Sequence, residues 1–168
     1  MRPEKGDYAE YYHRYIKQVE SEDIVEVLEN QLQSFENFYS SVTEEQGNFA
    51  YADGKWTVKE VIGHVIDTER IMAYRALAIA RKEKQSLPGF EQDDYVANGN
   101  FARRNLEDLI NEYKTLRVSN IAMFKSFSDE EFNRIGTASE NKVSVIALAF
   151  IIAGHELHHL NILKERYL

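Results

Sequence analysis

Apolar side chains recur at steps of three and four residues in four long segments, which is the spacing of an amphipathic helix. The segments are expected at about Glu22–Ser40, Val58–Arg81, from Asn105 to about Phe124, and from Val143 nearly to the C-terminus. Strand patterns are weak throughout. Because each apolar stripe needs partners, the pattern predicts an all-α protein, an antiparallel four-helix bundle.

Polar residues at the starts of these segments are typical of helix caps. Ser21 is the expected N-cap of the first helix. Thr57 and Glu60 have the spacing of a capping box before the second helix, and Ser128 and Glu131 repeat it before a short helical turn.

One long connection separates the second and third expected helices. Residues 83–104 lack a helical or strand pattern, and loops of this length are usually functional or mobile. No repeat, low-complexity segment or linker is visible, so residues 1–168 are expected to form a single domain.

Composition narrows the classes of function. The 20 Lys and Arg residues against 28 Asp and Glu give a net charge of −8. This balance argues against a nucleic-acid binder and against docking on an anionic membrane. The chain has no cysteine, which excludes disulfides, thiolate zinc sites and cysteine nucleophiles. Any thiol in its chemistry must therefore arrive as a co-substrate.

The hydrophobic segments do not predict a membrane protein. The longest uncharged apolar run, Val143–Gly154, would reach about 18 Å as a helix, against roughly 30 Å of hydrocarbon. Residues 1–10 carry charges and no apolar run, so no secretory signal is expected. The expected location is the cytoplasm.

Three of the five histidines lie close together in the last expected helix, at positions 155, 158 and 159. At about 100° per residue, His159 falls within the apolar stripe beside His155, whereas His158 falls at its edge. Two inward histidines one turn apart can ligate one ion, and a metal site is favoured over a purely structural pair.

The His-Glu-x-x-His spacing also matches a zinc peptidase motif. The context argues against this class, because only nine residues follow His159 and the extended form of the motif lacks its glycine at Ile162. The third ligand must come from upstream. His64 on a rigid helix is preferred to His13, with Asp67 and Glu69 as alternatives.

Two carboxylates on the second helix need an explanation of their own. Glu69 falls within the apolar stripe, where pairing with an arginine is the simpler interpretation and orientation of a metal-binding histidine is the alternative. Asp67, one turn from His64, could orient that histidine in the same way.

Several motifs together resemble the DinB-like superfamily. The residues from Lys55 to His64, followed by Asp67, Glu69 and Arg70, resemble its first signature. The middle loop is similar at Pro88–Phe90 and 93–95. The closing motif is similar over Ala153–His159 and 162–165.

This resemblance implies a four-helix bundle that holds one divalent ion, zinc or nickel, through His64, His155 and His159. It further implies enzymes that use small thiols such as bacillithiol or mycothiol, and a homodimer. Other members are named only as metal-dependent hydrolases.

Three functions follow from these expectations. The preferred one is metal-dependent transfer of a small thiol to an electrophilic substrate. The second is hydrolysis by a metal-bound water, for which Glu156 lies too far round the helix to be a convincing base. The third is a non-enzymatic stress-response module with a structural metal. Glu156 and Asp67 remain candidates for residues that orient the metal ligands without binding the ion themselves.

Overall fold

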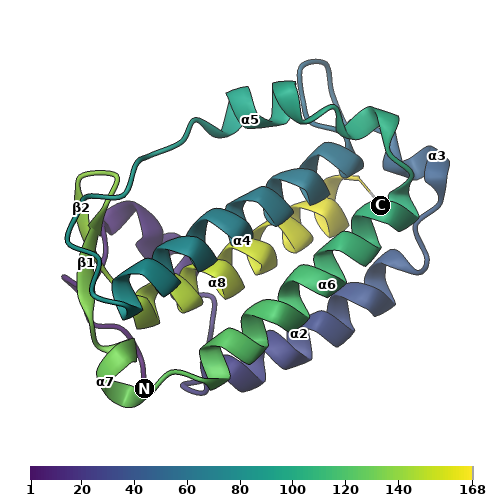
Figure 1. Ribbon diagram of the computed structural model, residues 1–168. Coiled ribbons are helices and arrows are strands. Elements are labelled where there is room, and N and C mark those ends of the chain that lie inside the picture. The colour runs from purple at the N-terminus through teal and green to yellow at the C-terminus, as the bar shows by residue number, and fades with distance from the viewer. Residues whose placement is uncertain (168) are drawn as a thin grey trace.

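Four long helices form the body of the molecule in the computed structural model, which describes residues 1–167 (Figure 1). These are α2 (Ile24–Tyr39), α4 (Val58–Ala80), α6 (Leu106–Lys125) and α8 (Val145–Arg166). The predicted all-α four-helix bundle is confirmed. The short elements are η1 (Glu10–Tyr12), α1 (His13–Ile16), α3 (Glu44–Gly47), α5 (Gln92–Gly99), η2 (Phe101–Arg103), α7 (Asp129–Phe132), β1 (Ile135–Ala138) and β2 (Asn141–Ser144).

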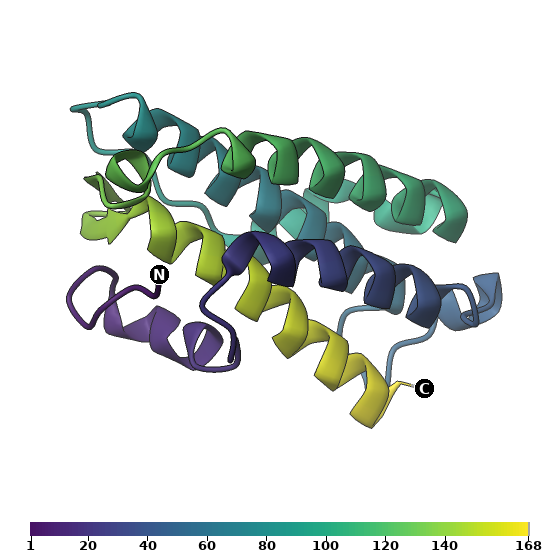
Figure 2. The ribbon, with the colours of Figure 1, turned by 90° about the horizontal axis from the view of Figure 1, so that it is seen from below.

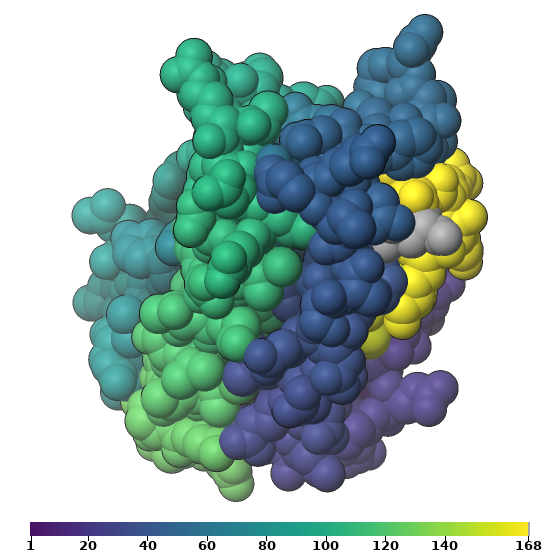
Figure 3. All heavy atoms as spheres, turned by 90° about the vertical axis from the view of Figure 1, so that its right-hand side faces the viewer, coloured from purple at the N-terminus to yellow at the C-terminus, as the bar shows by residue number. Residues whose placement is uncertain are grey.

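The helices form two antiparallel pairs. α4 lies against α8, and α2 lies against α6 (Figures 1 and 2). α4 and α6 run in the same direction, because the connection through α5 returns along the whole length of α4 before α6 begins. In the space-filling view of Figure 3, α2 and α6 close one side of the bundle as a continuous surface.

The helix starts follow their caps. The predicted capping boxes at Thr57–Glu60 and Ser128–Glu131 are both present. The N-cap of α2 is Asp23, whose side chain accepts the N–H of Glu26, so the prediction of Ser21 was wrong. The Ser21 hydroxyl instead accepts the N–H of Asp23 in the turn before the helix.

A small antiparallel hairpin was not predicted. β1 and β2 pair Ile135 with Ser144 and Ala138 with Asn141. Because β2 ends at Ser144, the last helix begins at Val145 and not at Val143. The backbone of Leu87 also bonds to the hairpin, through Thr137 and Ser139, so the hairpin anchors the start of the long connection.

The long connection contains α5 and is held to the bundle by few side chains. Within α5 only Val96 is buried. Phe101 follows it and packs on two glycines, since a Cβ added at Gly63 or at Gly99 would lie 2.3 Å from its ring. The position of the connection therefore depends on close packing of Phe101 against α4, which only a glycine at position 63 permits.

The core surrounds α8. Every residue of this helix from Val145 to Glu156 is buried. α8 is long and apolar enough to cross a membrane, but 72% of its most apolar window is buried inside the bundle, as in the core helix of a soluble protein.

Candidate metal centre

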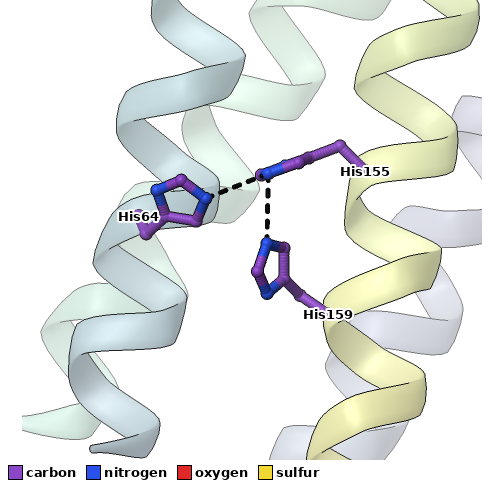
Figure 4. Close-up of side chains that lie close together, drawn as sticks. All are labelled: His64, His155 and His159. Atoms are coloured by element: carbon purple, nitrogen blue, oxygen red, sulfur yellow. Dashed lines mark hydrogen bonds between the residues drawn. The ribbon is translucent and has the colours of Figure 1, made fainter. Parts of the chain in front are cut away.

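Three histidines from α4 and α8 meet inside the bundle (Figure 4). The Nε2 atom of His155 lies 3.0 Å from Nε2 of His64 and 3.1 Å from Nε2 of His159. Ligand atoms of all three lie within 4.8 Å of one another. The two distances from His155 are close to the roughly 3.3 Å that separates two ligand nitrogens of a tetrahedral zinc ion.

The donor set fits a divalent cation. Hydrogen bonds alone leave the centre poorly satisfied, because the single lone pair of one Nε2 would have to serve two N–H groups. A cation would satisfy three converging lone pairs at once. Burial lowers the pKa of His64 to about 4. Burial and the neighbouring histidines lower the pKa of His159 to about 3 and that of His155 well below its usual value. All three rings are therefore neutral at pH 7, as metal ligation requires.

The other two histidines lie outside this cluster. His158 is half-buried and packs edge-on against the ring of Tyr15, 5.4 Å between centroids. His13 stacks on Tyr8, whose hydroxyl lies 3.1 Å from the His13 Nδ1 atom. The structure thus places His64, and not His13, beside His155 and His159.

Each of the two most buried histidines follows a glycine that another segment contacts closely. A Cβ at Gly154 would lie 2.1 Å from the carbonyl oxygen of Tyr15, so the backbone of α1 packs directly on α8 before His155. Gly63, before His64, contacts the Phe101 ring as described above. The two glycines therefore allow α1 and Phe101 to pack closely beside the histidine cluster.

Glu69 and Glu156 belong to a buried ion-pair network and not to the centre. Arg117 on α6, fully buried, donates two bonds of 2.8 Å to Glu69 and one of 2.6 Å to Glu156. The hydroxyl of Tyr113 donates to the same Glu156 oxygen at 2.5 Å. The interpretation of Glu69 as the partner of an arginine is confirmed, and the buried Glu156 is bound to α6.

Asp67 also lies outside the histidine cluster. It is half-buried, and among residues 1–167 its carboxylate has no hydrogen-bond or ion-pair partner. Burial raises its pKa, with Arg70 and Glu112 as its nearest charged influences. Its surroundings are therefore those of the α6 side of α4, and no contact supports a role in orienting His64.

A hollow of about 330 Å³ opens beside the histidines, and we call it the tyrosine hollow. His64 and His155 are among the residues that line it. Its walls include Tyr11, Tyr12, Tyr15, Thr68, Phe90 and Asp93. A second hollow of about 340 Å³, the tryptophan hollow, borders His159 and is lined by Tyr51, Trp56 and Tyr167. Asp93 borders both hollows, so space for small molecules reaches the centre from two sides.

Thr68 is a site residue that sequence reasoning missed. It lies one turn after His64 and is 4% exposed. In the described part of the chain, its hydroxyl is one of two buried side-chain groups without a hydrogen-bond partner, the other being Glu156 Oε1. Its spacing of four residues from His64 was the available signal. Because threonine is common in helices, this spacing alone does not mark it as a site residue.

Known proteins resemble this chain in sequence and in fold. The family model described as the DinB superfamily matches residues 27–163. A protein of Oceanobacillus iheyensis named "Putative metal-dependent hydrolase" is 23% identical over 96% of this chain and 88% of its own length. A Geobacillus thermodenitrificans protein of the same name is 21% identical over 71% of this chain and 68% of its own.

Two solved structures share the fold. YfiT from Bacillus subtilis, described as "a probable metal-dependent hydrolase with an unusual four-helix bundle topology", superposes with a TM-score of 0.73 at 16% identity. The match covers 98% of this chain and 90% of that one. A mycothiol-dependent maleylpyruvate isomerase superposes with a TM-score of 0.68 at 11% identity, covering 86% of this chain and 61% of that one.

Proposed function

Because the chain belongs to the DinB superfamily, we propose that it is a divalent-metal-dependent enzyme that transfers a small thiol to an electrophilic substrate in the cytoplasm. The ligands of the ion are His64, His155 and His159. Imidazole nitrogens suit both zinc and nickel. The metal-dependent names of the relatives and the mycothiol dependence of one structural neighbour support this proposal.

The observation that carries the proposal is the position of the tyrosine hollow. His64 and His155 line it directly, so an ion on their Nε2 atoms would face a space large enough for a small molecule. Three protein ligands with an accessible fourth position are typical of a catalytic ion, whereas a structural ion is enclosed by four. The described residues offer three histidines and no fourth ligand in this cluster.

The position and partners of Glu156 favour a thiol over water as the nucleophile. In the zinc peptidase motif, the glutamate after the first histidine is the base that activates water. Here Glu156 is buried, is bound by Arg117 and Tyr113, and does not line the hollow. When bound, a divalent ion lowers the pKa of a coordinated thiol or water. A thiol, with a pKa of about 8.5, needs much less assistance than water at about 15.7.

The two hollows provide room for both reactants. The sulfur of the thiol forms a bond to the electrophilic carbon, the thiol proton passes to solvent, and the leaving group departs with its bonding electron pair. The residues of this chain bind the two molecules on opposite sides of Asp93 and keep them next to the histidines.

Hydrolysis is the second candidate, because both curated relatives carry hydrolase names. Asp93 is the carboxylate that borders both hollows, and it would have to replace Glu156 as the base. An Asp93→Asn variant that abolishes ester hydrolysis would favour this reaction.

The test begins with metal analysis of protein purified without a metal-affinity tag, where about one ion per chain is expected. Cobalt-substituted protein should then change its visible spectrum when a small thiol is added. Consumption of that thiol in the presence of a generic electrophile, such as an alkyl halide, completes the test. An unresponsive cobalt spectrum would support a non-enzymatic metal-binding module instead.

A further inference from the structure

The tyrosine hollow has an unusual combination of side chains for a protein site. Three tyrosines from η1 and α1, together with Phe90, supply aromatic rings, and Glu91 and Asp93 supply two carboxylates. In the described chain no lysine or arginine lines it. Aromatic faces combined with carboxylates are the surroundings in which proteins bind organic ammonium groups.

Thr68 adds an unpaired polar group to the hollow. Its hydroxyl is buried and has no partner within residues 1–167, although it lies one turn from His64. An unpaired buried hydroxyl costs about 1–3 kcal/mol unless a ligand or water satisfies it. A bound molecule with a donor or acceptor near the histidines would do so.

Arg75 lies beside Met72 and Phe90 of the lining and donates to the Pro88 carbonyl and the Ser139 hydroxyl. Arg14 is a second cation beside this hollow, and it is also engaged. Its guanidinium lies 3.8 Å from the centroid of the Tyr11 ring and 4.9 Å from that of Tyr15. It is not part of the lining. One cation therefore already rests on these rings, and the two carboxylates of the hollow remain available to a second.

We propose that the tyrosine hollow recognises the ammonium group of a small molecule, so that the thiol used by this protein carries an ammonium group. This deepens the proposed function and rests on it. The carboxylates of Glu91 and Asp93 and the faces of the tyrosine rings hold the ammonium group, and the sulfur points toward His64 and His155.

The experiment compares three thiols that share a mercaptoethyl unit and carry a positive, a neutral and a negative far group: thiocholine, 2-mercaptoethanol and 2-mercaptoethanesulfonate. Their affinities are measured from the spectrum of the cobalt-loaded protein. The charge of the bound ion and the different pKa values of the three thiols also affect the order of their affinities. The decisive quantity is therefore the change in preference between the wild type and a Glu91→Gln/Asp93→Asn variant.

The variant should lose about fivefold or more in its preference for thiocholine over 2-mercaptoethanesulfonate, which corresponds to one or two exposed charge interactions. Its affinity for 2-mercaptoethanol should change less than twofold. Glu107→Gln/Asp108→Asn removes the same charge from an exposed turn of α6 and should leave the preference intact. An unchanged preference in the hollow variant would overturn the inference.

Choline separates this inference from the proposed function, because it carries the ammonium group but no sulfur. The wild type should bind choline by calorimetry, and the hollow variant should bind it at least fivefold more weakly. If all three thiols leave the cobalt spectrum unchanged, the proposed function fails while choline still tests ammonium recognition. Absence of choline binding, together with an unchanged thiol preference in the hollow variant, would contradict the inference alone.

Discussion

At the scale of single residues, the histidines divide into a cluster of three and two outside it. Alanine at His64, His155 or His159 removes one of three converging nitrogens, and each change should abolish most metal binding. His158→Ala and His13→Ala should keep about one ion per chain, because their rings bind aromatic neighbours instead. Metal analysis after dialysis measures this, and an equal loss from His158→Ala would contradict the assignment.

Gly154 offers a way to change the hollow without touching a ligand. A methyl group there would collide with the backbone of Tyr15, so Gly154→Ala must displace α1. We expect a loss of about 1–3 kcal/mol in the free energy of unfolding and weaker thiol binding, with the ion retained. Gly47→Ala is the control, since its Cβ would meet side chains and no backbone, Lys59 at 3.2 Å and Leu106 at 3.7 Å.

The depressed pKa values of the histidines predict how the metal-free protein responds to acid. In the folded state His64 and His159 titrate at about 4 and about 3, whereas unfolded histidine titrates near 6.5. The unfolded chain therefore takes up protons first, and stability falls as the pH drops from about 6.5 toward 4.

In urea unfolding of chelated protein, His64 and His159 together should account for a loss of about 2 kcal/mol between pH 6.5 and 5.5, and His155 adds to it. A His64→Gln/His159→Gln variant should lose much of this dependence, whereas His13→Gln should keep it. An identical pH dependence in the double variant would contradict the burial of these rings.

At the scale of elements, Arg117 joins α4, α6 and α8 through two buried carboxylates. Glu69 raises the pKa of Arg117 well above its usual value against the opposing effect of burial. Arg117→Met would leave both carboxylates buried without a cation and should cost about 3–5 kcal/mol in urea unfolding. Lys125→Met breaks the exposed pair with Glu29 and should cost no more than about 1 kcal/mol.

The long helices were predictable because periodicity and capping are local signals, as at Thr57–Glu60. The hairpin was not. Its two turn residues, Ser139 and Glu140, both have positive φ, at 49° and 63°, where the usual sequence signal would be asparagine and glycine. α5 escaped notice for a similar reason, since a single buried residue, Val96, gives no periodic stripe.

In the candidate site, too, the features with a local sequence signal were predictable and those that depend on tertiary packing were not. The spacing of His155 and His159 already indicated a pair facing inward. The residue periodicity of α4 did not choose His64, because its ring enters the bundle beside the apolar stripe; the resemblance to a family indicated it. Arg117 lies 48 positions from Glu69, so only the packing of α6 on α4 could identify it as the partner. The residues that line the tyrosine hollow come from four separate segments, and no local pattern predicts their meeting.

At the scale of the whole molecule, the bundle has a core that does not depend on an ion. The ligands come only from α4 and α8, and these helices also pack through buried side chains such as Ile62, Met72 and Leu148. Removing the ion should therefore leave the helical circular dichroism signal intact. Because an ion that binds the folded state stabilises it by mass action, the melting temperature should fall on chelation and recover on adding metal.

The size of the change on chelation distinguishes a catalytic ion from a structural one. For a catalytic ion, the metal-free protein should remain cooperatively folded at 25 °C, and His64→Ala should melt at about the temperature of the chelated wild type. A zinc ion that builds the fold would behave differently, since its binding free energy is then folding free energy and the chain unfolds without it. Collapse of the helical signal on chelation would contradict the enzyme proposal, because an ion needed to hold α4 against α8 would have little freedom to exchange a ligand for substrate.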